Sequence, residues 1–164
     1  MKPIIASTTR IITAPADKIY KIIADYRSGH PLIVPKENFL SLEVETGGFG
    51  EGTIVRFQMK MLGRTQTFRS RISEPIPGRH LVETDLTTGV VTSFTVSPCE
   101  DENHTQVTIS TELNGFNVVQ AILAKPMLQK VYANELELLS ETVGKFVTPT
   151  QATDTVSGSA APPR

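Results

Sequence analysis

Residues 55–72 read VRFQMKMLGRTQTFRSRI, and this stretch decides how the rest of the chain is interpreted. Its apolar and polar side chains alternate with a period of two, which is typical of strands that bury one face. A tight turn centred on Gly63-Arg64 predicts an antiparallel hairpin in which Met59 pairs with Phe68. With this pairing the apolar side chains share one face of the hairpin and the cations share the other.

Strand patterns continue on both sides of the hairpin, separated by short polar turns. The predicted strands are 4–13, 39–45, 55–61, 66–72, 79–86, 90–96 and 105–113. No helical pattern separates any two of the strands that follow residue 39. Short strands joined in this way are typical of an antiparallel meander.

Two short helical segments precede the meander. Pro15 fits the first position of a helix that continues to Ala24, with one apolar face formed by isoleucines. The segment 28–31, Ser-Gly-His-Pro, ends this helix, and residues 31–35 predict a short turn or helical piece.

A long amphipathic helix follows the meander and is predicted to start at Pro126. Apolar side chains recur there at three- and four-residue intervals over about 20 residues. This stripe consists of Leu128, Val131, Tyr132, Glu135, Leu136, Leu139, Val143 and Phe146. Residues 116–123 predict a separate short helix or lid-like segment. We expect the stripe of the long helix to cover the apolar face of the sheet.

Composition and charge exclude several classes of protein. The chain has 164 residues, of which 39% are hydrophobic and 20% are charged, as in ordinary globular domains. Residues 148–164 are rich in Thr, Ser, Ala and Pro and predict a disordered tail, so we place a single domain at residues 1–147. The net charge of −1 argues against a nucleic-acid-binding protein. No apolar run suffices for an integral membrane span, and we expect a cytoplasmic location.

Motifs for metal binding and nucleophilic catalysis are missing from the sequence. Cys99 is the single cysteine, and His30, His80 and His104 do not have metal-ligand spacing, so we expect no metal and no cofactor. No Gly-x-Ser-x-Gly nucleophile motif occurs.

Several segments carry a resemblance to a known family. They are IITAPADKIY at 11–20, IADY at 23–26, GEGT at 50–53, EPIPGR at 74–79, FTVSP at 94–98 and TQVTI at 105–109. In this order they resemble the START-like helix-grip superfamily of polyketide cyclases/dehydratases, lipid-transport proteins and birch-pollen-allergen relatives. The resemblance covers residues 4–147. It implies an α+β fold, in which a curved antiparallel sheet of about seven strands wraps around a long C-terminal helix, with two short helices after the first strand.

The resemblance also implies a cavity between the sheet and the long helix. A small hydrophobic or amphipathic ligand (a lipid, a polyketide or a quinone-like molecule) would bind there, and the protein would act as a carrier or sensor. The expected contact residues are Tyr26, Phe49, Val55, Phe57, Met59, Phe68, Val82, Phe94, Met127 and Val131. Methionines such as Met59 and Met127 suit an adaptable pocket, although methionine also fills gaps in a solid core.

The alternative is an enzyme of the polyketide cyclase/dehydratase type that acts in the same cavity. The candidate catalytic residues are Tyr26, Asp25 and His80. The Tyr26 hydroxyl could orient a carbonyl at the cavity rim; otherwise Tyr26 completes the apolar helix face and Asp25 caps the turn. The side chain of His80 faces either the cavity or solvent. Glu83 and Asp85 share one strand face, which is either exposed or directed into the cavity, where one of them would act as an acid.

The glycine-rich loop at residues 47–52 allows two interpretations. A strand follows it rather than a helix, which argues against a phosphate-binding loop. It is either a mobile flap over the cavity mouth with Phe49 at its tip, or an ordinary glycine-rich hairpin.

A basic surface is predicted on the outer face of the sheet. Between residues 52 and 81 the cations outnumber the acids by six to one. Arg56, Lys60, Arg69 and Arg71 fall on the face opposite the apolar side chains. They could make peripheral contact with an anionic membrane or dock an acidic partner, or they form an ordinary solvated surface.

Overall fold

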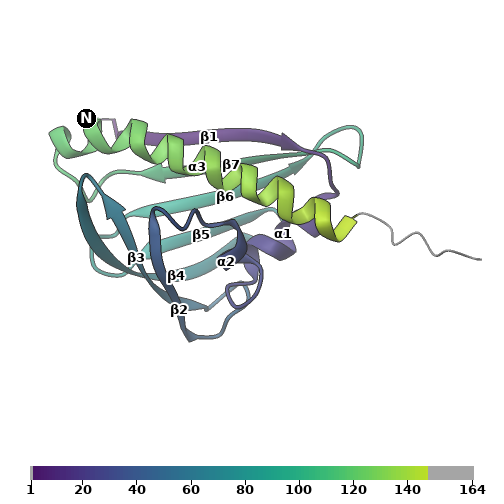
Figure 1. Ribbon diagram of the computed structural model, residues 1–164, viewed down its shortest axis with the longest axis horizontal. Coiled ribbons are helices and arrows are strands. Elements are labelled where there is room, and N and C mark those ends of the chain that lie inside the picture. The colour runs from purple at the N-terminus through teal and green to yellow at the C-terminus, as the bar shows by residue number, and fades with distance from the viewer. Residues whose placement is uncertain (1, 148–164) are drawn as a thin grey trace, which may run out of the picture.

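The computed structural model of the chain describes residues 2–147 (Figure 1). Its elements in chain order are β1 (Ile5–Ile12), α1 (Ala16–Ala24), α2 (His30–Ile33), β2 (Phe39–Thr46), β3 (Ile54–Met61), β4 (Arg64–Ile76), β5 (His80–Asp85), β6 (Val91–Pro98), β7 (Thr105–Glu112) and α3 (Val118–Val147). The tail predicted at 148–164 lies outside the described residues.

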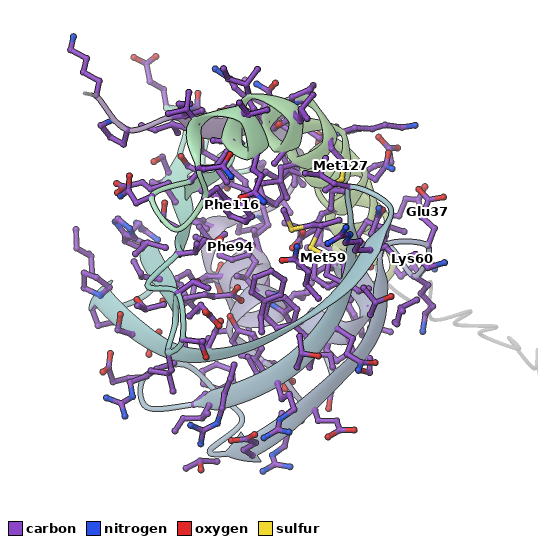
Figure 2. All side chains as sticks on the ribbon, turned by 90° about the vertical axis from the view of Figure 1, so that its left-hand side faces the viewer. Glu37, Met59, Lys60, Phe94, Phe116 and Met127 are labelled. Carbon is purple, nitrogen blue, oxygen red and sulfur yellow. The ribbon has the colours of Figure 1, made fainter. Side chains whose placement is uncertain are left out.

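One antiparallel sheet of seven strands forms the body of the fold. The strand order is β1-β7-β6-β5-β4-β3-β2, so β1 and β2 are its edges. The sheet curves into a trough, and α3 lies along the open side of this trough (Figures 1 and 2). The predicted helix-grip arrangement of a curved sheet, a long C-terminal helix and two short helices is therefore confirmed.

The core fills the space between the concave face of the sheet and the helices. The predicted stripe of α3 is buried from Leu128 to Val143, whereas Phe146 is 71% exposed, so the prediction for Phe146 is wrong. Helix α1 buries Ile19 and Ile23 and packs on β6. Apolar burial of this kind is the main force that holds the two layers together.

Helix α3 begins eight residues earlier than predicted, and Pro126 lies inside it. The side-chain oxygen of Asn117 accepts a hydrogen bond from the amide of Gln120 at 2.9 Å and so caps the first turn. Proline removes one backbone hydrogen bond from a helix. Here the carbonyl left without a partner belongs to Ile122, in an exposed turn where water can replace the lost donor.

The β3–β4 hairpin has a different register from the predicted one. Met59 lies opposite Gln66, and Phe68 lies opposite Phe57. The turn consists of Leu62 and Gly63, both with positive φ (50° and 75°), as a two-residue type I′ turn requires. The error is two residues along β4, and because strand side chains alternate with a period of two, the predicted faces are still correct.

Edge strand β2 contains bulges that change which side chains face inward. The pairing with β3 shifts between Phe39 and Ser41, and Leu40, which was predicted to face the core, is 47% exposed. Phe39 packs against the core instead. A bulge adds one residue to a strand and reverses the alternation beyond it.

Candidate functional site

A cavity lies between the concave face of the sheet and α3. Its apolar lining consists of Val34, Phe39, Leu42, Val55, Phe57, Met59, Met61, Phe68, Val90, Phe94, Leu113, Phe116 and Leu128. Its polar lining consists of Tyr26, His30, Ser70, Glu83, Asp85, Thr92, Thr111, Tyr132 and Glu135. Figure 2 shows Met59, Phe94 and Phe116 inside the trough, with Lys60 outside it.

The volume of this cavity is about 70 Å³. Pockets for drug-sized ligands measure roughly 300–1,000 Å³, and a water molecule takes about 30 Å³ in the liquid. The cavity therefore holds a small group as it stands, and a larger ligand requires side chains of the wall to move.

The wall formed by β3 and β4 is suited to such movement. The ring of Phe57 stacks on Phe68 with 5.2 Å between centroids and lies 5.7 Å from the ring of Phe39. Met59 and Met61 complete this wall, and their unbranched thioether side chains adapt to different shapes. Phe39 and Phe57 are only partly buried, so their rings can move outward.

An outer groove of about 320 Å³ adjoins the cavity at α2 and β2. Val34, Phe39 and Leu42 line both hollows, so these three side chains form the partition between the cavity and the surface. The bulge in β2 lies between Phe39 and Ser41, next to these side chains, and there the pairing of β2 with β3 is interrupted.

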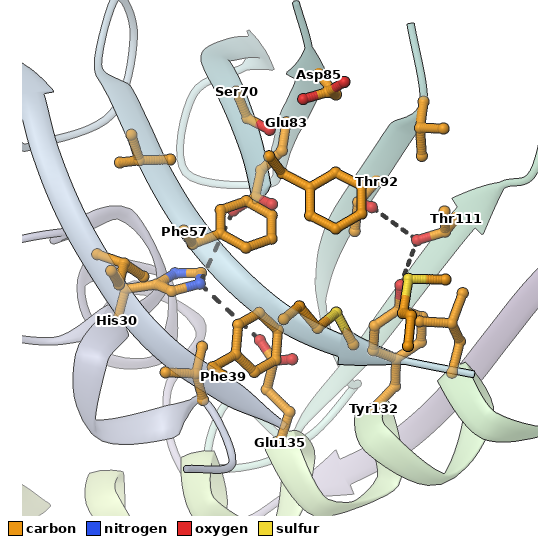
Figure 3. Close-up of a pocket in the computed structure, with 18 of the residues that line it drawn as sticks. His30, Phe39, Phe57, Ser70, Glu83, Asp85, Thr92, Thr111, Tyr132 and Glu135 are labelled. Carbon is orange, nitrogen blue, oxygen red and sulfur yellow. Dashed lines mark hydrogen bonds and ion pairs between the residues drawn. The ribbon is translucent and has the colours of Figure 1, made fainter. Parts of the chain in front are cut away.

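Inside the cavity, four side chains form a buried polar cluster. The hydroxyl of Tyr26 donates a hydrogen bond to Oε1 of Glu83 at 2.5 Å. The same Oε1 lies 3.8 Å from Nε2 of His30, and Oε1 of Glu135 lies 4.0 Å from this Nε2 (Figure 3). We call Tyr26, His30, Glu83 and Glu135 the acid cluster.

The orientation of His30 follows from its second ring nitrogen. Nδ1 lies 2.7 Å from the carbonyl oxygen of Ile23, which can only accept, so Nδ1 carries the hydrogen. Nε2 is then the nitrogen that faces the two carboxyl groups. The imidazole stacks on the ring of Tyr26 at 4.4 Å between centroids and meets Phe94 edge-on, which fixes its plane.

A turn after α1 brings Tyr26 and His30 together. Oδ1 of Asp25 accepts hydrogen bonds from the amides of Arg27 and Ser28, and the carbonyl of Asp25 accepts from the amide of His30 at 2.6 Å. Asp25 does not line the cavity. Its observed interactions match the capping interpretation of this residue.

Burial controls the protonation of the acid cluster. Burial and then the nearby Glu83 raise the pKa of Glu135 well above its ordinary value, which favours the protonated carboxyl. Burial lowers the pKa of His30, which is therefore neutral. Burial and then Glu83 raise the pKa of Tyr26, which remains a donor. Such shifts in a cavity are typical of functional sites.

A second polar chain lies across the cavity from His30 (Figure 3). The hydroxyl groups of Thr92 and Thr111 hydrogen-bond at 2.7 Å, and the hydroxyl of Thr111 also bonds that of Tyr132. Burial raises the pKa of Tyr132, so its hydroxyl stays protonated. The chain offers hydroxyl groups to a ligand from β6, β7 and α3.

Asp85 also borders the cavity, but its carboxylate oxygens are used in hydrogen bonds, mostly with the β5–β6 turn. Its oxygens accept hydrogen bonds from the amides of Arg69, Thr87 and Thr88 and from the Thr88 hydroxyl. Burial alone would raise the pKa of Asp85, but these hydrogen bonds outweigh it and hold the pKa below its ordinary value. Asp85 is therefore ionised and stabilises the turn.

Six of the ten predicted contact residues line the cavity. They are Tyr26, Val55, Phe57, Met59, Phe68 and Phe94. Met127 and Val131 lie on α3 beside the lining residue Leu128 but do not border the cavity.

On β5 the predicted ligand contact of Val82 is wrong, and of the two orientations considered for His80 the structure has the one that points away from the cavity. Leu81, Glu83 and Asp85 point to the concave side, so Val82 and His80 point away from the cavity. His80 therefore does not reach the acid cluster. The strand has apolar residues on both faces, and the period-two rule does not decide between them.

The loop at residues 47–52 braces α1 and does not cover the cavity. The carbonyl of Gly48 accepts from the amide of Tyr26 at 2.9 Å, and the amide of Gly50 donates to Ala24 at 3.0 Å. Phe49 is 56% exposed and does not line the cavity, so the expectation of a flap with Phe49 at its tip is wrong. Gly48 has a φ of 138°, a backbone conformation that favours glycine, and a β-carbon there would also displace the Arg27 side chain.

Sequence reasoning missed His30, Glu83 and Glu135 as members of one site. The signal for Glu135 was visible, because it is the one charged residue in an apolar helical stripe. A carboxyl at such a position is buried, and buried carboxyls are rare unless they have a partner or a function. His30 and Glu83 join it only through the folding of distant segments.

The predicted basic surface is partly neutralised. Glu45 on β2 pairs with both Arg56 at 2.9 Å and Arg69 at 2.7 Å. These hydrogen bonds, the one from Arg69 first, lower the pKa of Glu45. Lys60 and Arg71 are exposed on the same convex face.

Residues 2–147 contain neither a membrane-spanning helix nor a cluster of metal-binding side chains. None of the three helices combines the length and the apolar character that a membrane span requires. In the same range no group of three or more His, Cys, Asp or Glu side chains has an arrangement that could hold a metal ion.

Comparison with known proteins gives one family match. Residues 3–144 match the family described as polyketide cyclase / dehydrase and lipid transport. No curated protein matches the chain.

Solved structures with the same fold share little sequence with this chain. The solution structure of the KanY protein is 23% identical with a TM-score of 0.78, and the match covers 88% of this chain and 99% of that one. The Zhui aromatase/cyclase from Streptomyces sp. R1128 is 18% identical with a TM-score of 0.65, covering 87% and 94%. A START superfamily protein from Mycobacterium smegmatis is 15% identical with a TM-score of 0.63, covering 87% and 98%. At these identities the likeness concerns the fold alone.

Proposed function

Because this chain belongs to the polyketide cyclase/dehydrase and lipid-transport family, we propose that it binds a small hydrophobic or amphipathic molecule between the sheet and α3. The ligand would be a lipid, a polyketide or a quinone-like compound, and the protein would act as its carrier or sensor. The observation that carries the proposal is an apolar cavity into which a few polar side chains converge. Ligand sites in proteins have this composition.

Binding a molecule of this size requires the cavity to expand. The β3–β4 wall supports expansion because its methionines adapt and because Phe39 and Phe57 are not fully enclosed. The outer groove beside Phe39 provides a path along which a ligand can enter. A ligand ring would replace the contacts that Phe57 makes with Phe68 and Phe39.

A matched pair of variants on β3 tests the proposal. Met59 points into the cavity, whereas the neighbouring Gln58 points to solvent. Met59→Arg places a charge in the cavity and should abolish binding of the neutral fluorescent probe N-phenyl-1-naphthylamine. Gln58→Arg adds the same charge outside and should leave the affinity within about twofold of wild type. Equal effects of the two substitutions, or no binding by wild type, would contradict the proposal.

Native mass spectrometry of the freshly purified protein provides an independent test. We expect a copurifying apolar molecule in the wild type and its loss in Met59→Arg. Retention of the same molecule by Met59→Arg would place it outside the cavity.

A second candidate function is catalysis of the cyclase/dehydratase type in the same cavity. The observation in its favour is a protonated Glu135 close to the carboxylate of Glu83 and the neutral Nε2 of His30. Dehydration of a β-hydroxy carbonyl compound needs a base that removes the proton on the α-carbon and an acid that protonates the leaving hydroxyl. His30 or Glu83 could supply the base and Glu135 the acid.

The enzyme hypothesis predicts turnover, which a carrier lacks. A β-hydroxyacyl thioester of an aromatic acid should lose water in the presence of the wild type. Glu135→Gln should reduce the rate by about 100-fold, since general acid–base groups contribute roughly 10²–10⁴. If the thioester binds without reacting, the protein is a carrier for this class of compound.

A further inference from the structure

The charged groups that line the cavity all have the same sign. Among its lining residues in the described part of the chain, Glu83, Asp85 and Glu135 are acids, and neither lysine nor arginine is present. An anionic group placed there would lose its hydration, would find no basic side chain in the lining and would meet the negative charge of Asp85. The lining is therefore unfavourable for carboxylates, sulfates and phosphates.

The carboxyl of Glu135 makes no hydrogen bond within residues 2–147, and because no fully enclosed side-chain nitrogen or oxygen in this range lacks a partner, its oxygens are accessible from the cavity. Glu135 is 2% exposed, borders the cavity and points toward His30 (Figure 3). Its one ion-pair contact within residues 2–147 is with Nε2 of His30, at 4.0 Å. Buried polar side chains nearly always have a hydrogen-bond partner, so this one has capacity for a ligand.

Nε2 of His30 also has no hydrogen-bond partner within residues 2–147. Because Nδ1 carries the hydrogen, Nε2 of the neutral ring presents a lone pair. Nε2 lies 3.8 Å from Oε1 of Glu83 and 4.0 Å from Oε1 of Glu135, and both distances are too long for a hydrogen bond. Nε2 thus lies near a carboxyl oxygen of Glu83 and one of Glu135 without a hydrogen bond to either, and all three side chains border the cavity.

A primary ammonium group matches this position, since it has one positive charge and three N–H donors. We propose that the cavity accepts an apolar molecule with a primary ammonium group, which donates to Glu83, Glu135 and His30, and that it rejects carboxylates of the same size. The inference rests on the proposed function, because it names the class of ligand for the same cavity. Phe94 and Tyr26, which pack on His30, would contribute aromatic surface beside the cation.

Binding of the ammonium group displaces one proton. In the free protein Glu135 is protonated, and in the complex its carboxylate accepts an N–H of the ligand, so the proton passes to solvent. The other titratable groups that line the cavity are Tyr26 in the turn after α1, His30 on α2, Glu83 and Asp85 on β5, and Tyr132 on α3. They include neither lysine nor arginine, and burial lowers the pKa of His30, so none of them supplies a competing cation.

Three ligands of similar size test the inference: benzylamine, benzyl alcohol and benzoate. Their affinities can be measured by isothermal titration calorimetry, and amide chemical-shift changes can locate the bound molecule. We expect benzylamine to bind about tenfold more tightly than benzyl alcohol, because its hydrogen bonds are charge-assisted. We expect no measurable binding of benzoate. Titrations at pH 7 in buffers of different ionisation enthalpy should show release of about one proton per benzylamine.

A pair of variants on α3 links the preference to the cavity. Glu135→Gln removes the buried carboxyl, whereas Glu137→Gln removes an exposed carboxyl that pairs with Arg10. Glu135→Gln should weaken benzylamine about tenfold, leave benzyl alcohol within about twofold and abolish proton release. Glu137→Gln should change none of the three quantities.

The possible outcomes separate this inference from the proposed function. If benzyl alcohol binds in the cavity and benzylamine binds no more tightly, the ammonium inference is wrong and the proposed function stands. The inference is also wrong if Glu135→Gln leaves the preference unchanged, or if benzylamine shifts only amides outside the cavity. If none of the three ligands and no N-phenyl-1-naphthylamine binds, both proposals are wrong.

Discussion

The β3–β4 wall and the acid cluster face the same cavity but are built in opposite ways. The wall comes from one hairpin, in which residues close in sequence, such as Phe57 and Phe68, pack through apolar contacts. The acid cluster takes His30 from α2, Glu83 from β5 and Glu135 from α3. Apolar contacts stabilise the fold, whereas a buried carboxyl without a hydrogen bond destabilises it. From this difference we expect substitutions in the wall to lower stability and substitutions of Glu135 to change ligand binding more than stability.

Phe68→Ala should give the largest change in stability. Its ring is buried and stacks on Phe57, and its removal should lower the free energy of unfolding by about 3 kcal/mol. The exposed Phe49 is the control, and Phe49→Ala should change stability by less than about 0.5 kcal/mol. Urea denaturation measures both. If the two variants were equally stable, the wall would not have the structural role assigned to it.

Replacing Glu135 by leucine should raise the stability of the protein, whereas Phe68→Ala lowers it. Leucine has a similar volume and needs no hydrogen bond, so Glu135→Leu should raise the free energy of unfolding by about 1–2 kcal/mol. The same denaturation experiment on Glu137→Leu, at an exposed position of α3, should show no gain. A loss of stability in Glu135→Leu that approaches that of Phe68→Ala would mean that the carboxyl holds the fold together.

The acid cluster should also make stability depend on pH in a defined direction. Burial and Glu83 raise the pKa of Glu135 above its ordinary 4.5, so the folded protein holds a proton that the unfolded chain releases. The bound proton of Glu135 contributes to the stability of the folded protein in full below pH 4.5, and this contribution is lost as the pH rises toward the folded-state pKa. Wild type should therefore lose stability relative to Glu135→Gln between pH 5 and 7, by at most about 1.4 kcal/mol per pH unit.

Thermal unfolding of both proteins at several pH values measures this difference. A constant difference across the range would contradict the raised pKa. A relative gain of wild type with rising pH would place an ionised Glu135 in a favourable interaction that the structure does not contain.

The smallest effect on stability is expected for Met61→Leu. Leucine nearly conserves the volume of methionine, so the free energy of unfolding should fall by less than about 1 kcal/mol. The branched side chain is stiffer, however, and should lower the affinity for N-phenyl-1-naphthylamine more than that for the smaller benzyl alcohol. Fluorescence and calorimetric titrations measure the two affinities. If both changed equally, the adaptability of Met61 would not matter for binding.

Local sequence patterns were sufficient for most of the fold. The period-two alternation correctly placed Phe57 and Phe68 on one face, because that rule depends only on strand geometry. The period-two rule failed at Leu40, where a bulge changes the alternation, and the helical spacing failed at Phe146, which is 71% exposed near the end of α3. The start of α3 was missed because Asn117 is a weaker signal than Pro126.

The candidate site was less predictable, for a physical reason. Leu81 and Val82 are apolar on opposite faces of β5, so the pattern did not reveal that Glu83 points inward. His30 depends on the turn that Asp25 stabilises after α1, and its distance to Glu135 depends on how α3 crosses the sheet. Only Glu135 could be recognised from sequence, as a charge within an apolar stripe.

The most direct test of the central claim is a crystal structure of the protein grown with 2-naphthol, a neutral ring with one hydroxyl. We predict density for the ring between the β3–β4 wall and α3, with Phe57 or Met59 displaced and the cavity larger than its present 70 Å³ or so. A cavity that keeps its present side-chain positions, with 2-naphthol bound only on the surface or not at all, would contradict the account.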